Sequence, residues 1–315
     1  MKVAIIIGFS YLLIKKDDYN YLLPGIVLDL YMAYQYAISI ACDKILVVSD
    51  HTDLVIDRQL LNLLYEGEVD VGVTNFFKLL YTNRQLLEYT TMDNLNVHLR
   101  DTGKGATRLF FYYSGHAHNG MILVPKNTNL QLFGLTDLIS CILTDSKSRC
   151  EVFCVMDCCN SKGLDLPYKL VTKIKFKDGV SSLKLENKDD ISLLNNSVSE
   201  IEDIGGDYQL INFNNCKWYG TRRLVCIAAS NAAFSSHFGS KFTIKLFQYL
   251  RNNDIKSYVT LIFLLNYEFR NNKELFYQIK ASYPDEYIIQ PWIQKPTLLA
   301  LRYDKLTYTI KMAIT

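Results

Sequence analysis

Short uninterrupted apolar runs alternate along this chain with longer amphipathic stretches. The clearest runs end abruptly at polar or glycine residues, as strands covered on both faces of a sheet do. Between them, apolar residues recur at the three- and four-residue intervals typical of helices that cover a sheet. This alternation predicts an α/β fold, a three-layer α/β/α sandwich with a mostly parallel central sheet. The expected strands are 3–8, 44–49, 108–113, 120–125, 151–156, 224–229 and 298–303, and the expected helices are 25–41, 84–99, 135–143, 241–250 and 258–270.

One stretch departs from this pattern. Residues 170–215 carry closely spaced lysines, then clusters of Asp, Asn and Glu and a Gly-Gly pair. A polar stretch of this length inside an apolar chain predicts an inserted, flexible loop region with some strand content. We expect the 315 residues to form a single domain, residues 1–315, that carries this insertion.

Composition limits the class of protein. Hydrophobic residues make up 49% of the chain and the net charge is +2, which excludes a disordered protein and gives no electrostatic case for nucleic-acid binding. No run reaches the ~18 uncharged apolar residues of a membrane span, and the apolar start lacks the cleavage site of an export signal. Eight cysteines are too few for a disulfide scaffold.

We therefore expect a cytoplasmic protein with free thiols and no membrane partner, acting as a monomer. The abundance of Asn, Ile, Lys and Tyr suits an AT-rich genome such as that of a large DNA virus. In that case the compartment would be the host cytoplasm.

Two of the expected strands end in residues that suit nucleophilic catalysis. If strands 108–113 and 151–156 are neighbours in a parallel sheet, their carboxyl ends meet at one edge, where sites collect in such sheets. A cysteine nucleophile needs an adjacent base, most often a histidine. We therefore expect His116 and Cys159 to approach one substrate carbonyl. The residues after the two strands are Ser114, Gly115 and His116, and Asp157, Cys158 and Cys159.

The same histidines and cysteines could be read as metal ligands. Structural zinc sites usually contain a ligand pair separated by ~2–4 residues. The pair His116 and His118 and the adjacent pair Cys158 and Cys159 fit that spacing poorly. We expect no metal here.

The loops after both strands resemble those of the metacaspases, relatives of the caspases among caspase-like cysteine peptidases. Metacaspase loops read approximately Tyr-Ser-Gly-His-Gly and Asp-(Cys/Ser)-Cys-His-Ser-Gly, the second followed by Leu-Asp-Leu-Pro-Tyr. The corresponding segments here are 113–117 and 157–168, and segments 5–11 and 23–29 also resemble the start of that family. The likeness, which covers residues 1–170, implies a caspase-hemoglobinase-like sandwich and a cysteine-type endopeptidase.

The resemblance also implies roles for single residues. Cys159 would be the nucleophile, and His116 would transfer the proton. The backbone N–H groups of Ala117 and Cys159 would form the oxyanion hole. Asp29 and Asp157 match the acids that select Arg or Lys at the cleavage position, with Ser114 beside them. The expected partners are therefore protein or peptide substrates with basic residues.

The chain departs from the family pattern in three places. Ala117 replaces a glycine, and its Cβ would be strained if that position required a positive φ. Asn160 and Lys162 replace the histidine and glycine beside the nucleophile. These departures leave open an alternative, a catalytically impaired homologue that binds peptides or proteins as a decoy.

The family's calcium site is also poorly represented. Asp165 matches one of its acids, but residues 120–133, where others would be expected, contain none. Ca²⁺ takes 6–8 oxygen ligands, many of them carboxylate. We therefore expect no cofactor, with calcium activation as the less favoured alternative.

Overall fold

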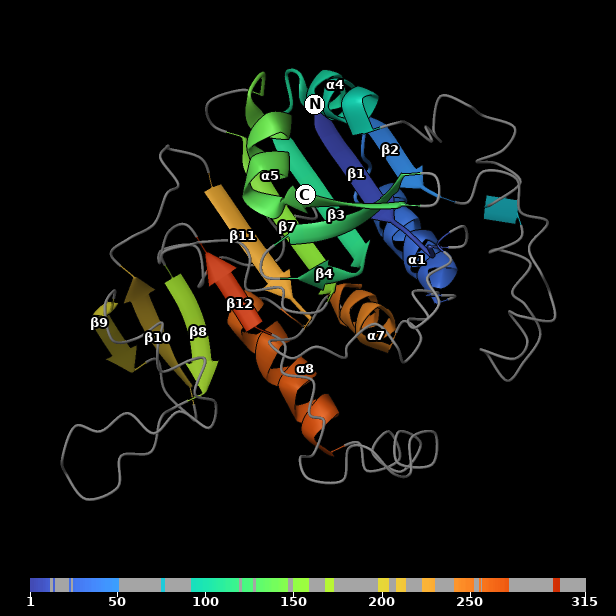
Figure 1. Cartoon of the computed structure of the whole chain (residues 1–315). Helices are drawn as coiled ribbons and strands as arrows, with labels where there is room; N and C mark the ends of the chain where they lie inside the picture. Colours follow the sequence, from blue (N-terminus) through green and yellow to red (C-terminus); the bar gives the residue numbers. More distant parts are fainter. Residues whose placement is uncertain are drawn as a thin grey trace.

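The computed structural model describes the chain in segments that together contain the sheet and its helices (Figure 1). The described residues are 1–11, 14, 23, 25–50, 75–76, 92–118, 121–126, 129–146, 150–158, 168–172, 198–203, 208–213, 223–229, 241–251, 255, 257–271 and 297–300.

A nine-stranded sheet, in the order β2-β1-β3-β7-β11-β12-β8-β10-β9, is the centre of the molecule. Its first five strands are parallel, and the others join antiparallel. A separate antiparallel sheet has the order β4-β5-β6. The strands are β1 (Lys2–Gly8), β2 (Lys44–Ser49), β3 (Arg108–Gly115), β4 (Ala117–His118), β5 (Met121–Lys126), β6 (Asn129–Gly134), β7 (Glu151–Cys158), β8 (Tyr168–Thr172), β9 (Val198–Asp203), β10 (Tyr208–Phe213), β11 (Arg223–Ala228) and β12 (Thr297–Ala300).

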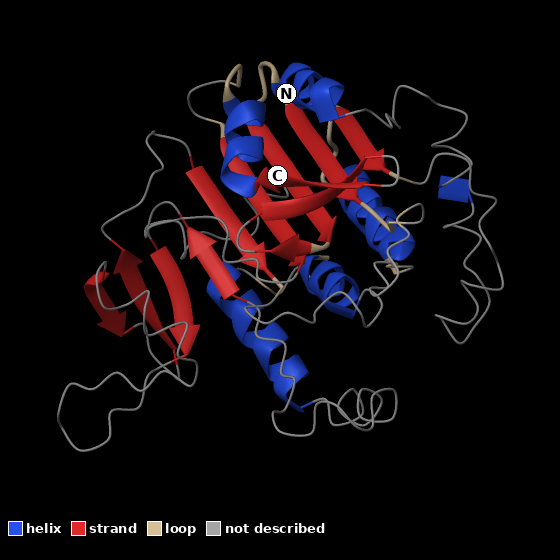
Figure 2. Ribbon diagram, viewed as in Figure 1, coloured by secondary structure: helices blue, strands red, loops and turns tan. Residues whose placement is uncertain are grey.

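Helices cover both faces of the parallel part of the sheet (Figures 1 and 2). On one face α4 packs on α5, and on the other α7 packs on both α1 and α8. The expected three-layer α/β/α sandwich with a mostly parallel sheet is thus confirmed. The helices are α1 (Ile26–Ser39), α4 (Met92–Gly103), α5 (Leu135–Leu143), α7 (Lys241–Leu250) and α8 (Tyr258–Asn271).

Burial explains why the apolar runs form strands. Residues Val3–Ile7 of β1 are fully buried, because β2 and β3 flank the strand and helices cover both of its faces. A strand in such a position has no solvent-facing side, so its sequence does not alternate between polar and apolar residues. The described cysteines Cys42, Cys141, Cys150, Cys154, Cys158 and Cys226 are free thiols. None of the described helices has the length and apolar character needed to cross a membrane.

The structure differs from the sequence prediction mainly at element ends. Strands β3 and β7 run through Gly115 and Cys158 instead of ending at Tyr113 and Met156. The hairpin strand β6 was not predicted. Within 170–215 the structure has the end of strand β8 and strands β9 and β10, all in the main sheet, and the rest of that stretch lies outside the described residues. Its expected flexibility therefore stays a prediction.

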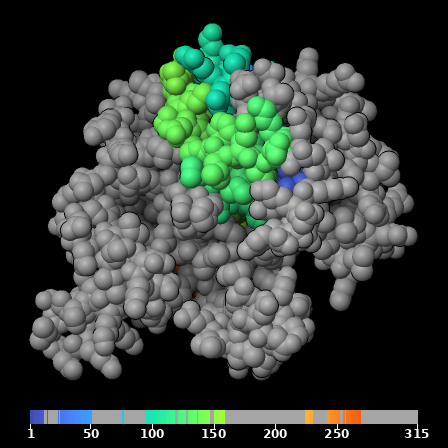
Figure 3. All heavy atoms as spheres, viewed as in Figure 1, coloured from blue at the N-terminus to red at the C-terminus, as the bar shows by residue number. Residues whose placement is uncertain are grey.

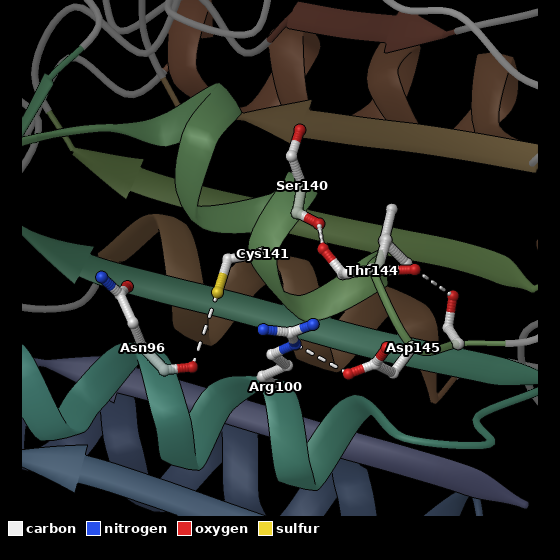
Figure 4. A network of polar contacts seen from close by, with 8 residues as sticks. Asn96, Arg100, Ser140, Cys141, Thr144 and Asp145 are labelled. Atoms are coloured by element: carbon white, nitrogen blue, oxygen red, sulfur yellow. Dashed lines mark hydrogen bonds and ion pairs between the residues drawn. The ribbon is translucent and has the colours of Figure 1, made fainter.

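A polar network joins the two helices on the α4–α5 face (Figure 4). The guanidinium of Arg100 donates to a carboxylate oxygen of Asp145 at 2.7 Å, and the Cys141 thiol donates to the carbonyl of Asn96 at 3.5 Å. The Arg100 and Asp145 side chains are largely exposed, so solvent screens the pair and it adds little to stability. In Figure 3 helices α4 and α5 and the β5–β6 hairpin form the coloured surface toward the viewer.

Tyr36 provides a test of the packing between α1 and the sheet. Its ring contacts Phe110, Phe153 and Phe247, and its hydroxyl has no hydrogen-bond partner within the described part of the chain. Because an unsatisfied buried hydroxyl is costly, Tyr36→Phe should raise the free energy of unfolding by about 1 kcal/mol in urea denaturation. Tyr112→Phe is the matched control. It removes a hydroxyl that is hydrogen-bonded and should lower the same quantity.

Candidate active site

The carboxyl ends of β3 and β7 lie side by side. The two strands are parallel neighbours, and their last paired residues are Gly115 and Cys158. His116 follows β3 directly, and Cys159 is the residue after β7 but lies outside the described residues. The prediction that these strands are neighbours in a parallel sheet is confirmed. The contact between the imidazole and the thiol stays a prediction.

His116 is half-buried and is held by two tyrosines. Its backbone N–H donates to the hydroxyl of Tyr11 at 2.8 Å, and its ring packs on the Tyr11 ring with centroids 4.7 Å apart. Its carbonyl accepts from the Tyr113 hydroxyl at 2.6 Å and from the Leu123 N–H at 2.9 Å. Hydrogen bonds therefore hold both the N–H and the carbonyl of His116, and so fix the backbone that carries the imidazole.

Hydrogen bonding around His116 also orients the N–H of the next residue, Ala117. Ala117 pairs with Ile122 across β4 and β5, and the adjacent ladder bond runs from Leu123 to His116. In antiparallel pairing this alternation makes Ala117 and Ile122 a non-hydrogen-bonded pair, so the Ala117 N–H points away from β5. Of the described non-glycine residues only Tyr11 and Ala41 have a positive φ. The strain considered for Ala117 is therefore absent.

Three polar side chains expected to bind substrate come together beside this edge. Ser114 and Asp157 are register partners on β3 and β7, and Asp29 lies in the first turn of α1. The Ser114 hydroxyl donates to Oδ2 of Asp29 at 2.6 Å. All three side chains are buried. Two carboxyl groups and a hydroxyl thus lie together in the buried interior, and we call this group the acidic cluster.

Two further residues complete the acidic cluster and were not expected from the sequence. Thr243 of α7 donates to Oδ2 of Asp157 at 2.7 Å, and its oxygen is hydrogen-bonded to the Tyr112 hydroxyl. Because the Thr243 proton is used on Asp157, Tyr112 is the donor in the second bond. A threonine on a helix far away in the sequence gives no local signal of such a role.

The carboxyl group of Asp157 has a pKa well above its ordinary value. Burial is the main cause, the charge of the neighbouring Asp29 adds to it, and the hydrogen bond from Thr243 opposes it. Oδ1 of Asp157 has no hydrogen-bond partner among the described residues. Two close buried carboxyl groups repel each other when both are ionised. A cationic group entering the cluster would relieve that repulsion.

The expectation that the chain binds no calcium stays a prediction. They contain no group of three or more His, Cys, Asp or Glu side chains that could hold a metal ion. Asp165, which matches one family ligand, lies outside them, as do Asn160 and Lys162.

Solved structures similar to this chain include two caspase structures. A caspase-1 from Spodoptera frugiperda covers 98% of it at 11% identity, with a TM-score of 0.45 and 88% of the caspase chain matched. A pro-caspase-1 structure labelled "pro-sf-caspase-1" covers 95% at 10% identity, with a TM-score of 0.43 and 87% of that chain matched. No family model matches the sequence, and no curated protein matches it either. The likeness assigns this chain neither a family nor an activity.

Proposed function

We propose that this chain is a cysteine endopeptidase of the metacaspase type that cleaves after Arg or Lys. The supporting observation is the register of β3 with β7, which brings the residue preceding Cys159 beside the residue preceding His116. The acidic cluster is built on these same two strands. A nucleophile, a base and a pocket for a positive charge would then share one sheet edge.

The proposed reaction has two halves. His116 takes the thiol proton of Cys159, and the thiolate attacks the scissile carbonyl carbon. The N–H groups of Ala117 and Cys159 would stabilise the resulting oxyanion, a contribution of about 3 kcal/mol for one donor. The intermediate then collapses, and His116 gives its proton to the leaving amine. Water, deprotonated by His116, hydrolyses the thioester and restores the free thiol.

Selection of Arg or Lys would come from Asp29 and Asp157. Each carboxyl group has one oxygen held by a hydroxyl, Ser114 on Asp29 and Thr243 on Asp157. These hydroxyls fix the carboxyl groups, and a cationic ligand would relieve the repulsion between the two acids. A guanidinium or ammonium group supplies both the charge and the hydrogen-bond donors.

Fluorogenic peptides ending in Arg, Lys or Asp test the proposal. Wild-type protein should release fluorophore from the Arg and Lys peptides only, and Cys159→Ala should reduce that release by ~10⁴-fold. Cys158→Ala, the adjacent buried thiol, is the matched control and should keep activity. Absence of Cys159-dependent release from mildly acidic to mildly alkaline pH, with and without calcium, would contradict the proposal.

One argument for the decoy alternative was strain at Ala117, and that argument does not hold because Ala117 has no positive φ. The other grounds for a decoy are the poorly represented calcium site and the residues Asn160 and Lys162, which lie outside the described residues. Stoichiometric labelling of Cys159 by an Arg-containing peptidyl electrophile at neutral pH would argue against a decoy. A monomeric, cytoplasmic enzyme acting on protein substrates remains our expectation.

Thr243→Val should shift the pH dependence of KM, so that tight substrate binding requires a higher pH. The Thr243 hydrogen bond lowers the pKa of Asp157, so its loss leaves more of that carboxyl group protonated and neutral. We expect KM for an Arg peptide to rise about tenfold at mildly acidic pH and to recover as pH increases. Thr260→Val, an exposed threonine of α8, is the control. A KM–pH profile identical to wild type would contradict this role of Thr243.

A further inference from the structure

Tyr11 has a strained backbone that the fold maintains. Its φ is +58°, a conformation in which a bulky residue is rare. The carboxylate of Asp50, the residue after β2, accepts hydrogen bonds from the N–H groups of both Ser10 and Tyr11. Asp50 is itself buried. Strained conformations that surrounding groups hold in place cluster at functional sites.

The strain directs the Tyr11 side chain toward His116. The Tyr11 side chain is 1% exposed, and its ring meets the imidazole at an interplanar angle of 42°. Its hydroxyl accepts from the His116 N–H and donates to the Leu123 carbonyl, both at 2.8 Å. One side chain therefore contacts the ring of His116, its backbone and the hairpin that follows it.

The surrounding residues leave room for this contact. Gly115 precedes His116, and a Cβ at Gly115 would come within 2.8 Å of the hydroxyls of Tyr11 and Tyr113. Those hydroxyls lie 3.3 Å from each other and hold the N–H and the carbonyl of His116 respectively. Glycine thus permits two tyrosines to close around the histidine backbone.

We propose that Tyr11 is the positioning residue of His116. The Tyr11 ring sets the orientation of the imidazole by contact, and the Tyr11 hydroxyl sets the direction of the His116–Ala117 peptide. This inference rests on the proposed peptidase function, in which His116 moves the proton and the Ala117 N–H stabilises the oxyanion. Tyr11 acts through these groups and does not touch the scissile bond.

Two substitutions separate the ring from the hydroxyl. Tyr11→Phe keeps the ring and removes the hydrogen bonds, and we expect kcat to fall about tenfold with KM unchanged. Tyr11→Leu also removes the ring, and we expect kcat to fall about 100-fold, again with KM unchanged. Tyr36→Phe, a buried tyrosine on α1 away from His116, is the matched control and should leave kcat at the wild-type value.

A second readout needs no turnover. The imidazole C2–H signal of His116 in ¹H NMR, assigned by its absence in His116→Gln, reports the aromatic ring beside it. The signal should move in Tyr11→Leu, stay near its wild-type position in Tyr11→Phe, and be unchanged in Tyr36→Phe. Circular dichroism establishes that each variant is folded, and Tyr11→Phe keeps the test available if Tyr11→Leu does not fold.

The outcomes distinguish this inference from the proposed function. An unmoved His116 signal in folded Tyr11→Leu, or kcat equal to that of Tyr36→Phe in both Tyr11 variants, overturns the positioning role. A wild-type protein that cleaves no peptide overturns the peptidase proposal, while the NMR signal still decides whether Tyr11 orients the imidazole.

Discussion

Replacing Asp157 by asparagine should abolish cleavage after Arg and Lys and at the same time stabilise the folded chain. Removing one partner of a buried charged contact typically costs 2–5 kcal/mol, so we expect kcat/KM for an Arg peptide to fall by ~10³-fold. Asparagine can still accept the hydrogen bond from Thr243, so the local packing survives. Steady-state assays with Arg peptides and with isosteric neutral peptides should show that kcat/KM falls for the cationic substrate alone.

The stability gain follows from the raised pKa of Asp157, which burial and the neighbouring Asp29 cause. Between the ordinary aspartate pKa of ~3.9 and the raised folded-state pKa, the folded chain binds more protons than the unfolded chain. Stability of the wild type therefore decreases as pH rises through that window. Asparagine does not titrate, so urea unfolding of Asp157→Asn should lack this decrease and show about 2 kcal/mol more stability at high pH.

Asp101→Asn is the control for this experiment, since Asp101 is an exposed acid of α4. It should change neither the kinetics nor the pH dependence of unfolding. If Asp157→Asn cleaves Arg peptides as well as the wild type does, the acidic cluster takes no part in substrate recognition. The proposed specificity would then have no support.

Gly115→Ala should damage both the fold and the activity. The new Cβ would come within 2.8 Å of the Tyr11 and Tyr113 hydroxyls, and the φ of +156° disfavours a side chain. Overpacking of this kind costs about 3 kcal/mol of stability, and displacement of His116 should lower kcat/KM about 100-fold. Chemical denaturation and peptide assays measure the two effects.

A second glycine separates backbone strain from steric conflict. Gly105 has a φ of +71° but an added Cβ there meets no described atom within 4 Å. Gly105→Ala should therefore cost only about 1 kcal/mol and leave kcat/KM unchanged. If Gly105→Ala and Gly115→Ala lose the same stability and activity, backbone strain alone explains the effect at Gly115. The close approach of Gly115 to the tyrosines then has no consequence for His116.

Sequence patterns were sufficient for the five parallel strands of the central sheet because helices cover both faces of that part (Figure 1). A strand such as β1 has no polar side, so its buried run is visible without any structural information. The same runs placed Ser114 and Asp157 close to the ends of two neighbouring strands, and the structure brings both residues together with Asp29. Strand β6 was missed because its residues are mostly half-buried and alternate weakly.

The supporting residues of the site could not be found in this way. Tyr11 meets His116 only because Asp50 turns its backbone, and Thr243 meets Asp157 only because α7 packs against α1. These contacts join segments that are distant in the sequence, and a lone tyrosine or threonine has no spacing that marks it. Cys159 lies outside the described residues, so its relation to His116 is a matter for the labelling experiment.

The acidic cluster draws on α1, β3, β7 and α7, elements that are distributed from the first tenth of the chain to its last quarter. During synthesis the proposed nucleophile Cys159 and the proposed base His116 would leave the ribosome well before Thr243 does. A nascent chain would therefore carry reactive groups without a finished recognition site. In the proposed peptidase, selective cutting after Arg or Lys would therefore begin only after α7 has docked.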